Sequence, residues 1–239
     1  KTQEELATRL SMSRPSFAWF PGCKIAYHLP QYGRATRAVL SALAVDLRDM
    51  EFNCCGWPVR HQSFEASVYS AARNLALAAR QGLSILTPCK CCFGNLKHAQ
   101  DWLAKRPGLQ RDVSALLQEE GLAYDPSEPT VRVEHSLTVL RDHVGFDRIR
   151  EAAGNTLQGW RIAPHYGCHA LRPSAVTHFD DPLAPTVMES VLGAARARVL
   201  DWPLRLECCG NPLWEKNREL SLALARKKLM DAEQAGADV

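Results

Sequence analysis

The sequence predicts an α/β protein made of two similar units related by a pseudo-twofold axis, each a small, mostly parallel sheet flanked by helices. Short apolar segments typical of strands alternate with longer helical segments, which is the pattern of strand–helix–strand units. A spaced cysteine pattern also occurs once in full and a second time in part. Gly-Cys stands at 22–23 and 167–168, and Cys-Cys-Gly follows at 54–56 and 208–210. All nine cysteines fall inside these two copies.

Length and composition exclude several classes of protein. The 239 residues are enough for one large or two small domains. A formal charge of +3 with scattered basic residues argues against a nucleic-acid partner. The sequence contains no apolar run of the roughly 20 residues that span a bilayer, and residues 1–14 lack a signal-peptide pattern. We therefore expect a cytoplasmic protein without a transmembrane segment, whose thiols stay reduced.

The first unit is predicted at residues 17–130, after a lead-in at 1–16, and it ends in a helical extension. Its cysteine groups each follow a predicted strand: Cys23 the first, the pair at 54–55 the second, and Cys89 the third. The C-terminal edge of a parallel sheet is where ligands collect, so we expect these groups to converge. The predicted elements are strands 17–20, 49–52 and 83–87, with helices 34–46 and 64–81, the latter closed by Gly82.

The second unit is predicted at residues 131–239. If Gly236 is aligned with Gly82, Val239 lies opposite Ile85, and the counterpart of Cys89 falls near position 243. We therefore expect this unit to be truncated before its final Cys-x-x-Cys. Residues 92–159 are mainly helical, with helices 112–120, 136–143 and 147–157 and a strand at 131–133. The remaining predicted elements are strands 160–163 and 198–201 and helices 186–195 and 214–235.

The number and order of the cysteines favour iron–sulfur chemistry. Zinc binds four ligands, so a fifth thiolate in each set would be surplus. Adjacent side chains in an extended segment point opposite ways, which suits two irons of a larger cluster better than one small ion. Cys91, inside the Cys-x-x-Cys, is interpreted as a bystander thiol. A zinc-holding scaffold and simple packing of thiols in the core remain as alternatives.

Other residues beside the cysteines are candidates for supporting roles. His169 directly follows Cys168 and is the first candidate for a proton donor beside the cysteines, although a histidine there can also serve as an ordinary hydrogen-bonding residue. Lys90 and Arg172 stand beside cysteines, where a positive charge can offset an anionic cluster or hold an acidic substrate.

With these motifs in hand, the chain resembles the cysteine-rich CCG-domain family, most closely the B-type component of heterodisulfide reductase. The resemblance covers about residues 17–239 and depends on Phe-Pro-Gly-Cys, Cys-Cys-Gly, Thr-Pro-Cys-x-x-Cys and Tyr-Gly-Cys. It implies that each complete motif holds a noncubane [4Fe-4S] cluster through five cysteines. The implied ligands are Cys23, Cys54, Cys55, Cys89 and Cys92 for the first cluster, and Cys168, Cys208 and Cys209 for the second.

The resemblance also implies an activity and partners. The chain would be the catalytic subunit of a heterodisulfide-reductase-like oxidoreductase that reduces, or reversibly forms, a disulfide of small thiols. Electrons would come from a ferredoxin-like C-type subunit, itself supplied by a flavin-containing A-type subunit. The alternative is a CCG electron-transfer subunit of a succinate, lactate or glycolate:quinone-type oxidoreductase.

Overall fold

The computed structural model describes residues 14–127 and 130–239. The chain folds as two units: the first comprises the residues up to Cys89 together with Trp102–Ser136, and the second comprises Lys90–Asp101 with Leu137–Val239. Most of the predicted lead-in at 1–16 lies outside the described residues. The predicted domain boundary at 130/131 and the pseudo-twofold relation between the units stay predictions.

The first unit contains a four-stranded parallel sheet in the order β2-β1-β3-β4. The two central strands are its most buried part: Ala18 and Ile85, which pair across them, are both fully buried. This agrees with the apolar character of these segments, since central parallel strands are covered on both faces. The strands are β1 Ser16–Trp19, β2 Asp46–Asp49, β3 Ser84–Thr87 and β4 Val133–His135.

The prediction for β2 was wrong by three residues, since the strand runs over 46–49 and not 49–52. The preceding helix ends earlier than predicted, at Ala42, and Ala44 adopts a left-handed φ of 56°. That turn brings the chain into the sheet at Asp46, whose backbone N–H donates to Pro15. Residues 50–53 are therefore a connection between the strand and the cysteine pair.

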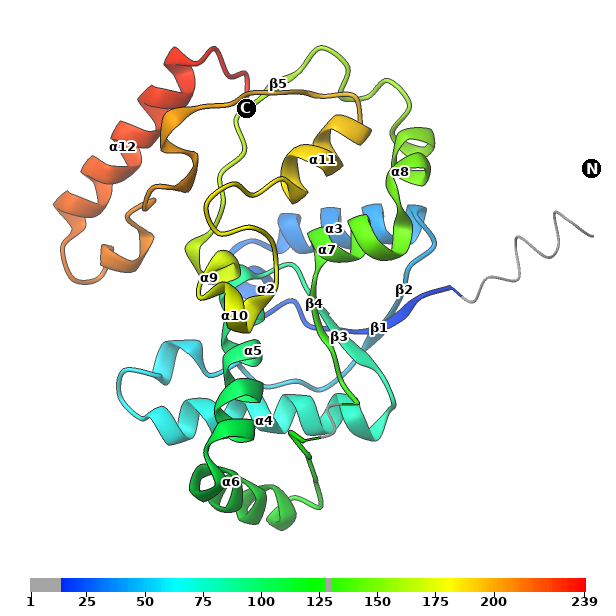
Figure 1. The fold of residues 1–239 in the computed structure, drawn as a ribbon, viewed down its shortest axis with the longest axis vertical. Helices are drawn as coiled ribbons and strands as arrows, with labels where there is room; N and C mark the ends of the chain where they lie inside the picture. Colours follow the sequence, from blue (N-terminus) through cyan, green and yellow to red (C-terminus); the bar gives the residue numbers. More distant parts are fainter. Residues whose placement is uncertain (1–13, 128–129) are drawn as a thin grey trace, which may run out of the picture. The chain divides into compact units, whose positions relative to one another are not determined.

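Helices cover both faces of this sheet. The chain runs from β1 through α2 (Cys23–His28) and α3 (Pro30–Ala42) to β2, and returns through η1 (Trp57–Val59) and α4 (Phe64–Arg80) to β3. In the strand order, the connection from β1 to β2 runs in one direction along the sheet and the connection from β2 to β3 runs in the other. Because such connections are right-handed, α3 and α4 lie on opposite faces. Figure 1 shows the sheet between these two helices.

The part of the first unit that follows β3 is helical. Helix α5 (Lys90–Lys105) continues from β3 across the boundary between the units, and α6 (Pro107–Glu119) packs against α4. Glu120, just after α6, binds both the Arg73 guanidinium at 2.6 Å and the Tyr69 hydroxyl of α4. These contacts fix α6 on the outer side of α4.

The second unit has a smaller parallel sheet, formed by β5 (Arg161–Ile162) and β6 (Arg198–Val199). On the other side of β5, Ala163 donates a 2.8 Å hydrogen bond to the carbonyl of Val239. The remaining elements are α7 Ser136–Val139, which crosses the unit boundary, the π-helix η2 Leu140–Val144, α8 Phe146–Ala153, α9 Cys168–Leu171, α10 Ser174–Thr177, α11 Val187–Ala194, η3 Pro203–Leu206, η4 Asn211–Leu213 and α12 Arg218–Gln234.

The predicted helix 214–235 begins later in the structure, at Arg218. A 3₁₀ turn precedes it, and the Asn217 side chain accepts a 3.0 Å hydrogen bond from the backbone of Leu220, which makes Asn217 the N-cap. Ser63 caps α4 in the same way through Ala66. The two helices therefore begin at equivalent positions of the repeat.

The predicted fold class is confirmed, since both units are α/β with parallel strands and flanking helices. Over the described ranges, we find no helix with the length and apolar character needed to cross a membrane.

Candidate functional site

The first-unit cysteines lie at the C-terminal edge of the sheet. Cys23 is the first residue of α2, just beyond β1, and Cys89 is the N-cap of α5, just beyond β3. These strands are neighbours, and the chain leaves them toward opposite faces, which makes this the crevice where open α/β sheets bind ligands. The pair Cys54-Cys55 follows β2, after the connection formed by residues 50–53.

Two of these thiols are close enough to share a metal centre. The sulfurs of Cys23 and Cys54 are 3.9 Å apart, and all nine cysteines are free. Two thiolates at about 2.3 Å from one tetrahedral metal lie about 3.8 Å apart, so this spacing fits common ligation. The pKa of Cys54 is raised by its hydrogen bond with Cys55, by burial and by the neighbouring thiols. A metal cation would stabilise the thiolate form against these effects, so the two sulfurs fit ligation of one metal or of one iron in a cluster.

The loop that carries the first pair is held by Asn74 of α4, which is fully buried. Its side-chain oxygen accepts a 3.1 Å hydrogen bond from the Asn53 backbone N–H. Its side-chain nitrogen donates to the carbonyls of Asn53, Cys54 and Ser70 at 3.3, 3.2 and 3.0 Å. One amide thus fixes the backbone on both sides of Asn53.

The turn after each cysteine pair is the same in both units. Gly56 and Gly210 have φ angles of 90° and 82°, which only glycine adopts without strain. Each lies against the backbone of the helix that follows: an added Cβ would come within 2.4 Å of the carbonyl oxygen of Ser67 or Ser221. The glycine of Cys-Cys-Gly therefore lets the pair lie close to α4 or α12.

The third cysteine group lies on α5. Cys92 is the third residue of that helix and is buried, while Cys91 is half-buried. From Lys90 to Asp101 the helix groups with the second unit. Over residues 14–127 and 130–239, no three histidine, cysteine, aspartate or glutamate side chains have the arrangement of a site for one metal ion. Ligation by all five thiols, with Cys91 outside the set, stays a prediction.

In the second unit, two of the three predicted ligands line one cavity. Cys168 is the first residue of α9, as Cys23 is of α2, and both it and Cys208 are exposed. The cavity has a volume of about 530 Å³, and Cys209 is half-buried and outside its lining. Its charged lining residues are Arg172, Arg205 and Glu207, and Arg205 pairs with Glu189 at 3.5 Å and with Asp201 at 3.1 Å. Its lining residues are Cys168, Arg172, Leu183, Pro203, Arg205, Leu206, Glu207 and Cys208.

Backbone hydrogen bonds hold the Cys168 turn beside the segment that leads to Cys208. The Arg205 carbonyl accepts a bond from the Tyr166 N–H at 3.3 Å and contacts His165 Nδ1 at 3.2 Å. The buried Trp202 indole donates to the Pro164 carbonyl at 2.8 Å. Three contacts thus join residues 164–166 to residues 202–205, which explains why the two cysteines share a cavity.

His165 differs from its counterpart in the first unit, Phe20, in being titratable. Its Nε2 is buried and has no hydrogen-bond partner within the described part of the chain. Burial lowers the pKa of His165 to about 4, and the charges of Lys228 and Lys90 add to the effect. His165 is therefore neutral at physiological pH.

The structure places the predicted His169 and Lys90 around the Cys168 turn. The His169 carbonyl lies against Gly94 of α5, where an added Cβ would come within 2.5 Å of that oxygen. The Lys90 side chain lies over Gly167, since an added Cβ would overlap its Cδ. Helix α5 thus brings a cation next to Cys168. The catalytic role of His169 stays a prediction.

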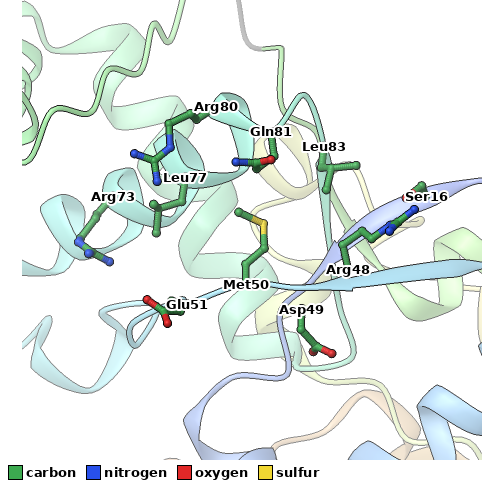
Figure 2. A pocket seen from close by; sticks show the side chains of 10 residues that line it. All are labelled: Ser16, Arg48, Asp49, Met50, Glu51, Arg73, Leu77, Arg80, Gln81 and Leu83. Atoms are coloured by element: carbon green, nitrogen blue, oxygen red, sulfur yellow. The ribbon is translucent and has the colours of Figure 1, made fainter.

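A larger cavity of about 680 Å³ lies in the first unit, between the end of β2 and α4, and it contains no cysteine or histidine (Figure 2). Arg48 pairs with Asp46, Asp49 with Arg37, and Arg73 with Glu120. Three of its charged residues thus have partners, and no predicted ligand or catalytic residue lines it. Its lining residues are Ser16, Arg48, Asp49, Met50, Glu51, Arg73, Leu77, Arg80, Gln81 and Leu83.

Known proteins resemble this chain over most of its length. A protein of Archaeoglobus profundus, described as similar to the B-type component of heterodisulfide reductase, is 30% identical over 230 residues, which are 93% of this chain and 76% of that protein. The 8-methylmenaquinol:fumarate reductase membrane anchor subunit of Wolinella succinogenes is 31% identical over 197 residues, or 81% of this chain and 66% of that one.

A solved structure shares the fold. The crystal structure of a hypothetical protein from Helicobacter pylori superposes with a TM-score of 0.66 at 17% identity. The match covers 93% of this chain but 40% of that one.

The model of the CCG cysteine-rich domain matches residues 17–97 and again residues 162–239. The two matches carry the two cysteine sets described above. The chain therefore belongs to the CCG cysteine-rich domain family, of which it contains two copies.

Proposed function

We propose that this chain is the iron–sulfur subunit of a heterodisulfide-reductase-like oxidoreductase. Its reaction would be the reduction, or reversible formation, of a disulfide between small thiols. The proposal is carried by one observation: free cysteines gather at the ligand-binding edge of the first sheet and around one cavity of the second unit.

The family resemblance and the positions of the free thiols support the following roles. Cys23, Cys54, Cys55, Cys89 and Cys92 would hold a noncubane [4Fe-4S] cluster, and Cys168, Cys208 and Cys209 would be ligands of a second. A bound cluster of this kind supplies single electrons. Asn74 holds the loop of the first cysteine pair in place, and Arg172 in the lining of the second cavity suits an anionic group.

The chemistry needs both electrons and protons. Reduction of RS–SR′ to RSH and R′SH consumes two electrons and two protons. The electrons would come from a ferredoxin-like C-type subunit, supplied by a flavin-containing A-type subunit. His169, next to Cys168 in the chain, would donate one proton, and solvent the other.

A second candidate function is electron transfer toward or from a quinone pool without disulfide chemistry. The similarity to the fumarate reductase subunit of Wolinella succinogenes favours it. In that case the cysteines would hold the same kind of cluster, but the cavity at Cys168 and Cys208 would bind no disulfide.

Metal analysis of anaerobically purified protein tests the proposal. Iron and acid-labile sulfide in equal amounts, with no zinc, is the expected result, and stoichiometric zinc would contradict it. Reduced viologen and a panel of small disulfides then separate the two functions. Thiol release that depends on the bound iron supports the reductase, whereas reoxidation by a quinone analogue without thiol release supports the alternative.

A further inference from the structure

The two cysteine pairs are supported by different buried side chains at the same position of the repeat. A shift of 154 residues pairs Gly56 with Gly210 and Ser67 with Ser221, and the close glycine–serine approaches confirm that alignment. The same shift pairs Asn74 with Lys228. The first unit therefore has a neutral amide where the second has an ammonium group.

Lys228 lies within the second unit, on α12, and is only 7% exposed. Its Nζ donates a hydrogen bond to the carbonyl of Leu204 in η3. Asp231, one turn further along α12, accepts a 3.0 Å bond from the backbone of Leu204. Helix α12 therefore holds both polar groups of the Leu204 backbone, four residues before the cysteine pair.

The surroundings of Lys228 act on its ammonium group in opposite directions. Its Nζ lies 4.7 Å from the centre of the Trp202 ring, which is the geometry of a cation–π contact. Burial lowers the pKa of Lys228, and Cys209, Glu207, Asp231 and Cys208 act in the opposite direction. The acidic and thiol groups around the ammonium include both members of the second cysteine pair.

We propose that Lys228 is the positioning residue of the second cysteine pair. Its ammonium holds the chain at Leu204, four residues before the pair, as the Asn74 amide holds Asn53 and Cys54, and it places a buried positive charge where the first unit has a neutral amide. The second pair is thereby selective for anionic reaction partners. This role does not depend on a bound cluster, so it can be tested apart from the proposed function.

The selectivity is measured on the reduced, metal-free full chain with two disulfide reagents. One is the dianion 5,5′-dithiobis(2-nitrobenzoate) and the other is neutral 4,4′-dithiodipyridine. Both react with the same thiolate, so its abundance cancels from the ratio of the two rates. Mass spectrometry of the peptide with Cys208 and Cys209 gives the ratio at the second site, and the peptide with Cys54 and Cys55 serves as the internal control.

Three variants separate the charge from the hydrogen bond. Lys228→Gln keeps a donor and loses the charge, Lys228→Met loses both, and Lys227→Met removes a neighbouring exposed charge. At low salt, the anion-to-neutral ratio at Cys208 and Cys209 should fall roughly two- to fivefold in both Lys228 variants. It should stay near the wild-type value in Lys227→Met, and at Cys54 and Cys55 in every variant.

The positioning role has its own readout in amide hydrogen exchange of residues 203–210. Exchange should accelerate in Lys228→Met and stay close to wild type in Lys228→Gln. An unchanged rate ratio in Lys228→Gln, or an equal fall in Lys227→Met, would overturn the charge effect. Unchanged exchange in Lys228→Met would overturn the positioning effect, and if that variant does not fold, Lys228→Gln still decides the charge effect.

Discussion

The side chain of Asn74 both accepts a hydrogen bond from the backbone of Asn53 and donates one back to it. A helix thereby fixes an irregular loop through a single residue. Buried amides that satisfy several backbone groups are costly to replace, because each group left without a partner keeps its full desolvation penalty.

Replacement of Asn74 by leucine should therefore destabilise the first unit. The variant keeps the side-chain volume but leaves one N–H and three carbonyls without this partner. We expect the free energy of unfolding to fall by about 2–4 kcal/mol. Urea denaturation of the metal-free protein measures it. Asn53→Ala is the control, since that side chain makes an exposed bond to Ser70, and it should lose less than about 1 kcal/mol.

Gly56 should be nearly irreplaceable. Alanine at this position combines a left-handed φ of 90° with a Cβ placed 2.4 Å from a backbone oxygen. We expect Gly56→Ala to lower the free energy of unfolding by about 2–5 kcal/mol. Gly82→Ala is the matched control, because Gly82 also has a positive φ but an added Cβ would meet nothing within 4 Å. Equal losses in the two variants would show that the approach to Ser67 is unimportant.

Most of the fold was predictable because local signals agree with it. Apolar segments and Gly82 located β1, α4 and β3 to within one or two residues. The start of β2 was mispredicted because Ala44 adopts a left-handed conformation, which is rare for alanine and has no sequence signal. The start of α12 was mispredicted because Trp214 looked like the first apolar residue of the helix, whereas the N-cap is Asn217.

Sequence motifs pointed to the cysteines of the candidate site, but not to the side chains and backbone groups that support them. Lys228 carries no motif, and a lysine in a helix usually points to solvent. It could have been found by extending the repeat: the alignment that pairs the two Cys-Cys-Gly motifs also pairs it with Asn74. The contacts of the Arg205 carbonyl had no sequence signal, because any residue supplies a backbone oxygen.

The ligand assignment predicts different outcomes for replacing a proposed ligand, Cys55, and a cysteine outside the proposed set, Cys91. Cys55→Ser should lower the iron content and the visible absorption of the anaerobically reconstituted protein by more than half. Cys91→Ser should leave both within about a tenth of wild type, since its thiol lies outside the proposed set. Both measurements are made per folded protein, with circular dichroism as the check. Equal losses in the two variants would mean that the assignment is wrong.

His165 should make the second unit less stable in mild acid. Its pKa is about 4 in the folded protein and about 6.5 when unfolded, because Nε2 is buried near Lys228 and Lys90. Between these values the unfolded chain binds the proton and the folded chain does not. Stability due to this group is thus fully present above pH 6.5 and is lost as pH falls toward 4. After allowance for solvent screening, we expect a loss of about 1–3 kcal/mol.

The variant His165→Phe isolates that contribution, because Phe20 is the buried counterpart in the first unit. It removes the titratable ring and the contact of Nδ1 with the Arg205 carbonyl, so its stability at pH 7.5 can differ from wild type by a constant. The informative quantity is the change with pH. The free energy of unfolding of wild type, measured by urea at pH 7.5 and pH 4.5, should fall more than that of the variant by about 1–3 kcal/mol. Parallel pH dependence in the two proteins would show that His165 takes up its proton as readily in the folded unit as in the unfolded chain.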